Sequence, residues 1–157
     1  MQGTLLKREY FYMNDERKEL EQQVFKWIEI AEEDLTMAKH AFTIESNIPY
    51  RLIGYHAQQC AEKYLKALLV SKFIDFPYTH SIEVLVKLSP AEFGLSNKLE
   101  RVFELTNYAV ARRYPGFYVN LSKADAEKAV KLAELTKLVI TSLLELNGFY
   151  FDKPDMR

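Results

Sequence analysis

The chain has 157 residues, with 21 lysines and arginines against 22 aspartates and glutamates and a net charge of −1. This length suits a single domain, residues 1–157, with a core that buries most of the surface exposed by the unfolded chain. The balanced charge gives no electrostatic footprint of a general nucleic-acid binder or of a protein that binds anionic membranes. Hydrophobic residues make up 48% of the chain, with only five Gly and five Pro, which argues against disorder and for long regular elements.

Cysteine and histidine usage limits the chemistry that the chain can carry. Cys60, the single cysteine, excludes an internal disulfide and a cysteine-based zinc cluster, and it fits a reducing compartment. His40, His56 and His80 lie in three different contexts, without a His-Glu-x-x-His or Glu-x-x-His motif. No glycine-rich phosphate loop is present. We therefore expect no metal, no cofactor and no cysteine nucleophile.

Neither targeting nor membrane insertion is indicated by the sequence. The N-terminal segment contains no apolar run of signal-peptide length, and no segment approaches the roughly 18 apolar residues of a membrane-spanning helix. The expectation is a soluble, cytoplasmic protein that makes no contact with a membrane.

The first predicted helix begins near Asn14, a suitable capping residue, and ends at the turn Glu45–Pro49, because the residue before a proline is disfavoured in helical geometry. Apolar residues at alternating three- and four-residue steps define its buried face: Val24, Ile28, Ala31, Leu35, Ala38 and Phe42. Residues 1–13 show no clear period. Their aromatic cluster, Tyr10–Tyr12, is too apolar for a free tail, so we expect it to pack against another surface.

The second predicted helix, Pro49–Lys72, is the element around which we expect the chain to be organised. One broad arc of this helix is apolar, as in a helix that packs inward on one side, and it contains Ile53, Ala57, Cys60, Ala61, Tyr64, Leu65 and Leu68. The opposite arc is polar and contains His56, Gln58, Gln59, Glu62, Lys63 and Lys66.

Three further helices are predicted after this element. The loop 75–81 leads into a short amphipathic helix through Ile82, Leu85 and Leu88, which Ser89-Pro90 closes. Ser96 is placed to cap a fourth helix that ends before Pro115 and Gly116. Its predicted buried positions are Leu99, Val102, Phe103, Thr106, Ala109 and Val110.

The fifth predicted helix opens at Ser122–Asp125, a Ser-x-x-Asp sequence related to the capping box, and ends at Asn147-Gly148. The aromatic tail 149–151 mirrors the aromatic cluster near the N-terminus. No run alternates with period two for long enough to need a strand. An all-α, up-and-down helical bundle of four long helices plus one short helix is therefore predicted, with a core at about residues 22–146.

The polar arc of the second helix has two interpretations. Glu62 and Lys66 are spaced i,i+4 in the favourable order, so they fit a surface ion pair on a solvated face, worth a few tenths of a kcal/mol. His56, Gln59 and Lys63 form an adjacent strip that could instead line a ligand-binding groove.

Arg113 is the second candidate for a binding role. The period of the fourth helix places it on the same face as Leu99, Thr106 and Val110, and an inward guanidinium must be paired because a lone buried charge is very costly. Its partner could be Glu62, a ligand phosphate or the carboxylate of another protein. Alternatively, Arg113 binds the carbonyl groups at the end of its own helix.

Four stretches in chain order resemble the HEPN family, the higher eukaryotes and prokaryotes nucleotide-binding domain. The second helix carries the sequence HAQQCAEKYLKALL, which is similar to the family's signature on that helix. The other stretches are the spacing Trp27, Ala31, Asp34, Leu35 and Ala38, the loop Pro77–His80, and the segment Ala111–Pro115. The last resembles an Ala-Arg-Tyr-Pro element with one inserted Arg or a substituted neighbour. The similarity covers about residues 22–146.

The resemblance implies an all-α bundle that is often dimeric. Many prokaryotic relatives are encoded beside a small nucleotidyltransferase, with which they form a toxin–antitoxin-like pair. Many are also metal-independent ribonucleases that use an Arg-x4-6-His motif. Here that motif lacks its imidazole, because the corresponding positions after Arg112 and Arg113 fall between Phe117 and Asn120 and no histidine follows His80.

Without the imidazole the expected general base is missing, and such acid–base help is typically worth about 10²–10⁴-fold in rate. Together with this missing histidine, the resemblance therefore implies a non-catalytic, homodimeric binding or partner subunit, with a nucleotide or RNA as ligand and a small nucleotidyltransferase as partner. The predicted ligand-binding residues are Arg113, Lys63, Lys66, His56, Gln59, Glu62 and Tyr114. The alternative is a divergent ribonuclease that uses Arg113 with Tyr118, Asn120 or His56 in place of the usual histidine. A nucleotide-binding module that acts alone is the third hypothesis.

Overall fold

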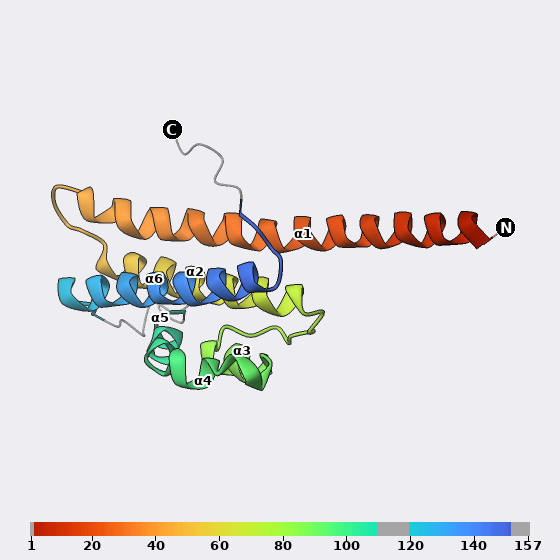
Figure 1. Cartoon of the computed structure of the whole chain (residues 1–157). Coiled ribbons are helices and arrows are strands. Elements are labelled where there is room, and N and C mark those ends of the chain that lie inside the picture. Colours follow the sequence, from red (N-terminus) through yellow and green to blue (C-terminus); the bar gives the residue numbers. More distant parts are fainter. Residues whose placement is uncertain (1, 110–119, 152–157) are drawn as a thin grey trace.

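The computed structural model describes residues 2–109 and 120–151, with side chains from residue 13 onward. Three long helices dominate this part of the chain: α1 (Gln2–His40), α2 (Tyr50–Ser71) and α6 (Lys123–Leu146). They lie side by side, and a group of short helices, α3 (Ile82–Leu88), α4 (Leu95–Lys98) and α5 (Thr106–Ala109), covers one side of α2 (Figure 1). Residues 2–109 and 120–151 contain no strand, so the predicted all-α helical bundle is confirmed.

Helix α2 is the central element of the bundle. It packs extensively against both α1 and α6, whereas α1 and α6 meet each other over a smaller area. Its predicted apolar arc is fully enclosed in the core with Leu20, Val24 and Ile140 from the two neighbouring helices. Gly54 allows a close approach on the same helix, because a Cβ at this position would lie 2.7 Å from Leu121 Cδ1. The central role expected for Pro49–Lys72 is therefore confirmed.

The start of the first helix differs from the sequence prediction. Helix α1 begins at Gln2, so Asn14 lies inside the helix and does not cap it. The N-terminal part of α1 projects beyond the ends of α2 and α6 (Figure 1). The residues from Met13 to Glu19 are exposed, and burial begins at Leu20. The side chains of the aromatic cluster Tyr10–Tyr12 lie outside the described residues.

The predicted fourth helix is helical but segmented within residues 95–109. Helix α4 follows Gly94, which is in the left-handed conformation at φ +59°, so Gly94 and not Ser96 precedes the helix. A 3₁₀ helix, η3 (Glu100–Leu105), separates α4 from α5. Leu99, Val102 and Leu105 are all fully buried, and their three-residue spacing matches the three residues per turn of a 3₁₀ helix. Two further 3₁₀ turns, η1 (Ala41–Thr43) and η2 (Ala91–Phe93), follow α1 and α3. Val110 lies outside the described residues.

The remaining helix starts agree with the sequence. Ser122 caps α6 by accepting a hydrogen bond from the backbone N–H of Asp125 at 3.2 Å, and the Asp125 carboxylate accepts one from the backbone N–H of Ser122 at 2.9 Å. This reciprocal pair is the predicted capping box. Ser81 caps α3 in a similar way by accepting from the N–H of Val84.

Helix α2 ends with a bulky residue in an unusual backbone conformation. The N–H of Ile74 donates to the carbonyl of Leu69 and that of Phe73 to the carbonyl of Val70, both at 3.0 Å, which is the Schellman arrangement. Phe73 therefore occupies the left-handed position, at φ +54°, where glycine is usual. Its side chain is 80% exposed, so little packing offsets the backbone strain.

We predict that Phe73→Gly raises the free energy of unfolding by about 1 kcal/mol, because glycine adopts φ > 0 without the Cβ clash. Urea denaturation measures the change. Phe73→Ala is the matched control, since it removes the ring but keeps the Cβ. An equal gain from the alanine variant would attribute the effect to the ring and would contradict the backbone explanation.

Candidate functional site

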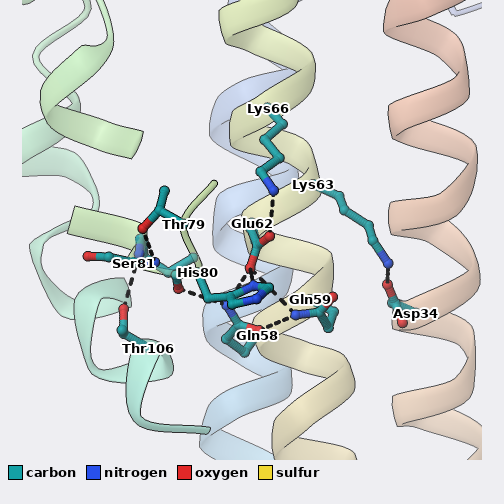
Figure 2. A network of polar contacts seen from close by, with 11 residues as sticks. Asp34, Gln58, Gln59, Glu62, Lys63, Lys66, Thr79, His80, Ser81 and Thr106 are labelled. Atoms are coloured by element: carbon teal, nitrogen blue, oxygen red, sulfur yellow. Dashed lines mark hydrogen bonds and ion pairs between the residues drawn. The ribbon is translucent and has the colours of Figure 1, made fainter. Parts of the chain in front are cut away.

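The buried carboxylate of Glu62, on α2, lies at the centre of a group of hydrogen-bonded polar side chains. The Glu62 side chain is only 3% exposed. Its oxygens lie 2.7 Å from Lys66 Nζ, 2.9 Å from Gln58 Nε2 and 3.1 Å from His80 Nδ1 (Figure 2). Gln59 extends the cluster by donating to Gln58 Oε1 at 2.7 Å. We call these five residues the Glu62 cluster.

The cluster lowers the pKa of Glu62. Burial by itself would raise the pKa, because it disfavours the charged form of a carboxyl group. The hydrogen bonds from Lys66, Gln58 and His80, together with the charge of Lys66, outweigh this effect and bring the pKa below its usual 4.5. Glu62 is therefore an anion held by the protein and not a proton donor at neutral pH.

Lys66 is enclosed by aromatic rings as well as by the carboxylate. Its Nζ lies 5.4 Å from the ring centroid of Trp27 and 5.5 Å from that of Phe76. These two rings meet edge to face with centroids 6.1 Å apart. The ammonium group thus has an anion on one side and negative ring faces on the other, an arrangement that stabilises a poorly hydrated cation.

A second charged group lies between α1 and α2. The Asp34 carboxylate of α1 is 2.8 Å from His56 Nδ1 and also pairs with Lys63 Nζ. Figure 2 shows the Lys63 side chain extending from α2 to Asp34, away from Glu62. His56 and Lys63 are partly exposed, with 27% and 18% of their side chains accessible, whereas Asp34 is buried. We call this group the Asp34 cluster.

The loop before α3 is fixed to α2 through His80. Besides the contact of its ring with Glu62, the backbone carbonyl of His80 accepts a hydrogen bond from Gln58 Nε2 at 3.2 Å. Two residues later, the N–H of Ile82 donates to Thr106 Oγ1 of α5 at 3.1 Å. The loop is thereby linked to both α2 and α5 (Figure 2).

The structure places five of the predicted ligand-binding residues in these two clusters: His56, Gln59, Glu62, Lys63 and Lys66. The interpretation of Glu62 and Lys66 as a surface pair on a solvated face is wrong, because both side chains are buried. Arg113 and Tyr114 lie outside the described residues, so the predicted position of Arg113 opposite this strip stays a prediction.

Sequence reasoning missed three members of the clusters: Asp34, Gln58 and His80. Gln58 was assigned to the polar arc but not to the site, although its i,i+4 spacing to Glu62 was a usable signal. Asp34 and His80 contact residues more than 15 positions away in the chain, and helical periodicity carries no information about such contacts.

Residues 2–109 and 120–151 contain no group of three or more His, Cys, Asp or Glu side chains placed to hold a metal ion. An open groove of about 420 Å³ lies elsewhere, between α1 and α6, and its lining includes Leu35, Lys137 and Leu138. The described members of the predicted ligand-binding set, which are His56, Gln59, Glu62, Lys63 and Lys66, do not line this groove. Within the same described ranges, no helix is both apolar and long enough to cross a membrane.

The model of the HEPN domain family matches residues 24–139 of the chain. The chain belongs to the HEPN family. The crystal structure of an archaeal HEPN homologue is similar to it, with 30% sequence identity and a TM-score of 0.58 over 76% of this chain and 97% of that one. A comparison with curated proteins found no match. Both charged clusters lie within the matched residues, so they are part of the HEPN domain and not of its extensions.

Glu62→Gln is expected to lower the free energy of unfolding by about 2–3 kcal/mol, because it leaves the Lys66 ammonium buried without its counter-charge. Chemical denaturation at pH 7 measures the loss. Glu83→Gln is the matched control, since Glu83 and Lys87 form an i,i+4 pair at 2.6 Å that is largely exposed. The control should change stability by less than about 0.5 kcal/mol. Equal effects of the two substitutions would contradict the buried-pair interpretation.

The pH dependence of stability provides a second test of Glu62. A carboxyl group with a lowered pKa in the folded state stabilises the fold fully above its unfolded pKa, near 4.5. That contribution is lost as the pH falls from 4.5 through the lower folded pKa. Glu62→Gln should therefore reduce the loss of stability below pH 4.5. The contribution of Asp125, whose pKa is also lowered by its Ser122 hydrogen bonds, remains in both proteins. The free energy of unfolding of both proteins is measured between pH 6 and pH 3. An equal decrease in the two proteins would contradict this assignment.

Cys60 should be unreactive in the folded protein. Burial raises the pKa of its thiol, and the negative charges of Glu32 and Asp34 raise it further. The reactive thiolate is therefore suppressed. We expect a chromogenic disulfide reagent to modify Cys60 only at the rate of unfolding, and rapidly in denaturant. Fast stoichiometric reaction of the native protein would show that the core around Cys60 opens locally.

Proposed function

We propose that this chain is a non-catalytic HEPN binding subunit that forms a homodimer, binds a nucleotide, and pairs with a small nucleotidyltransferase in a toxin–antitoxin-like system. The supporting observation is the internal pairing of the polar face of α2. Lys66 and Lys63 are neutralised by Glu62 and Asp34, and the Nδ1 atoms of His56 and His80 are held by the same two carboxylates. Such a face is suited to holding a ligand in a fixed orientation, because its own side chains are already ordered.

The proposed ligand-binding residues lie along the partly exposed edge of the polar face of α2. His56, Gln59 and Lys63 are neither fully buried nor fully exposed, and they follow one another at three- and four-residue steps on α2. Glu62 and Lys66 lie deeper on the same helix. From the sequence, Arg113 and Tyr114 of the segment Ala111–Pro115 are proposed to complete the site. A guanidinium and an ammonium together suit a phosphate group.

Nucleotide binding is tested by thermal denaturation with millimolar ATP, GTP and their monophosphates. A ligand that binds the folded state raises the melting temperature by mass action, and we expect Lys63→Ala and Arg113→Ala to abolish that rise. Lys87→Ala, in an exposed ion pair on α3, is the control and should respond as the wild type does. No shift with any nucleotide in the wild type would overturn the ligand part of the proposal.

The partner part of the proposal is tested separately. The chain is co-expressed with the protein encoded by the adjacent reading frame, and the mixture is analysed by size-exclusion chromatography with light scattering. A complex with a small nucleotidyltransferase, together with a dimeric mass for the chain alone, is the expected result. A monomeric chain beside an unrelated neighbouring protein would overturn this part.

A divergent metal-independent ribonuclease is the second candidate, and the Asp34–His56 pair favours it. A carboxylate 2.8 Å from an imidazole nitrogen orients the ring and supports its action as a base, and the ring is partly exposed. In this proposal Arg113 would stabilise the cleaved phosphodiester. Incubation with transfer RNA and messenger RNA compares the wild type with His56→Ala and Arg113→Ala. Cleavage by the wild type that both substitutions abolish would support the ribonuclease, and no cleavage above background would exclude it.

A further inference from the structure

The loop between α2 and α3 presents one aromatic ring to the core and another to the solvent. Phe76 packs edge to face against Trp27 of α1, with ring centroids 6.1 Å apart. Two residues later, Tyr78 is 89% exposed, the highest value among the large apolar and aromatic side chains that the structure describes. The loop therefore holds a tyrosine ring outside the core although the neighbouring Phe76 anchors the same segment inside it.

The position of Tyr78 is fixed by the residues on both sides of it. The ring of His80 lies 3.1 Å from Glu62 Oε2, and its backbone carbonyl accepts a hydrogen bond from Gln58 at 3.2 Å. Thr79 Oγ1 accepts another from the N–H of Ser81 at 3.1 Å. A ring on a loop that is held in this way is ordered before a ligand binds, so binding costs little conformational entropy.

The Tyr78 ring adjoins the proposed ligand-binding residues through His80. The two rings meet edge to face, with centroids 5.4 Å apart and an interplanar angle of 74°. The oxygen atom of Glu62 that contacts His80 also accepts a hydrogen bond from Gln59 Nε2 at 3.5 Å. Figure 2 shows His80 on one side of Glu62, whereas Lys63 extends toward α1 on the other side. Tyr78 therefore continues the partly exposed strip of α2 at the end opposite to Lys63.

A similar pair of rings belongs to the Asp34 cluster. Tyr55 meets His56 edge to face at 5.3 Å, and Asp34 holds His56 as Glu62 holds His80. Tyr55 is only partly exposed, so its ring offers a ligand less open surface than the ring of Tyr78 does. Of the two tyrosine–histidine pairs beside the strip, the one on the loop is thus the better placed to receive a flat aromatic ligand.

We propose that the base of a bound nucleotide stacks on the ring of Tyr78, while its phosphate group binds at Lys63. This inference rests on the nucleotide-binding part of the proposed function and names the residue that recognises the base. Every nucleobase has a π-face, so stacking accepts all of them and discriminates instead against phosphates that carry no base. The ligand class is therefore a nucleoside phosphate, with its base toward the loop and its phosphate toward α1.

The test compares two ligands with and without a base. Isothermal titration calorimetry on the full-length chain measures the Kd of ATP and of inorganic tripolyphosphate. Tyr78→Ala should weaken ATP about fivefold to a hundredfold, because stacking of one base on an aromatic ring has that worth, and should leave tripolyphosphate unchanged. Tyr78→Phe keeps the ring and should bind ATP as the wild type does. Tyr150→Ala is the matched control, because it removes a tyrosine that is 74% exposed after α6.

Nuclear magnetic resonance provides a readout that a purely structural role of Tyr78 would not move. Protons of a base that lies over an aromatic ring are shielded by the ring current. The H2 and H8 signals of ATP should therefore shift upfield when the wild-type protein is added. They should shift much less with Tyr78→Ala at the same fraction of bound ligand. Circular dichroism and thermal melting check that each variant is folded.

The outcomes separate this inference from the proposed function. If the wild type binds ATP and Tyr78→Ala binds it equally well, the inference is overturned while nucleotide binding stands. An equal loss of ATP and of tripolyphosphate in Tyr78→Ala would also overturn it, because the substitution would then act on the phosphate site. A loss of ATP binding in Tyr55→Ala and not in Tyr78→Ala would assign the base to the other ring. A wild type that binds no nucleotide overturns both the stacking and the nucleotide part of the proposed function.

Discussion

Glu62 imposes the constraint on which much of the polar structure depends. A carboxylate with 3% of its side chain exposed must be paired, because the cost of burying an isolated charge exceeds the net stability of most domains. Lys66 and Gln58 supply partners from the same helix, but His80 comes from the loop before α3. The need to pair Glu62 therefore holds the loop before α3 against α2. The hydrogen bond from Ile82 to Thr106 then positions α3 against α5.

The two charged clusters divide the polar face of α2 by depth. The Glu62 cluster is the deeper one, and its Lys66 is enclosed by Trp27 and Phe76. The Asp34 cluster lies nearer the solvent and connects α2 to α1. This arrangement explains how a face with so many ionisable groups can belong to a packing element. Its deeper groups hold the bundle together, and only its outer groups, His56, Gln59 and Lys63, are accessible to a ligand.

Helix α1 packs against the rest of the bundle over only part of its length. From Leu20 onward it packs against α2 and α6, whereas its N-terminal part projects past them (Figure 1).

The sequence by itself determined the features that depend on local geometry. Helical periodicity identified α2, its apolar arc and the all-helical character of residues 2–109 and 120–151. The Ser122–Asp125 spacing identified the capping box, because these interactions lie within a few residues of each other. The i,i+4 spacing likewise predicted that Glu62 and Lys66 would pair. What it could not determine was their burial, since burial depends on which elements pack over them.

Only the tertiary structure decided the contacts between distant residues. Asp34 meets His56 and Lys63 because α1 packs along α2, and His80 reaches Glu62 because the chain turns back after α2. Packing also favours a 3₁₀ segment at Glu100–Leu105 over the predicted continuous helix, because buried Val102 and Leu105 follow buried Leu99 at three-residue steps. Long-range packing sets the environment of each charge, and that environment converts a polar helix face into a partly buried, internally paired site.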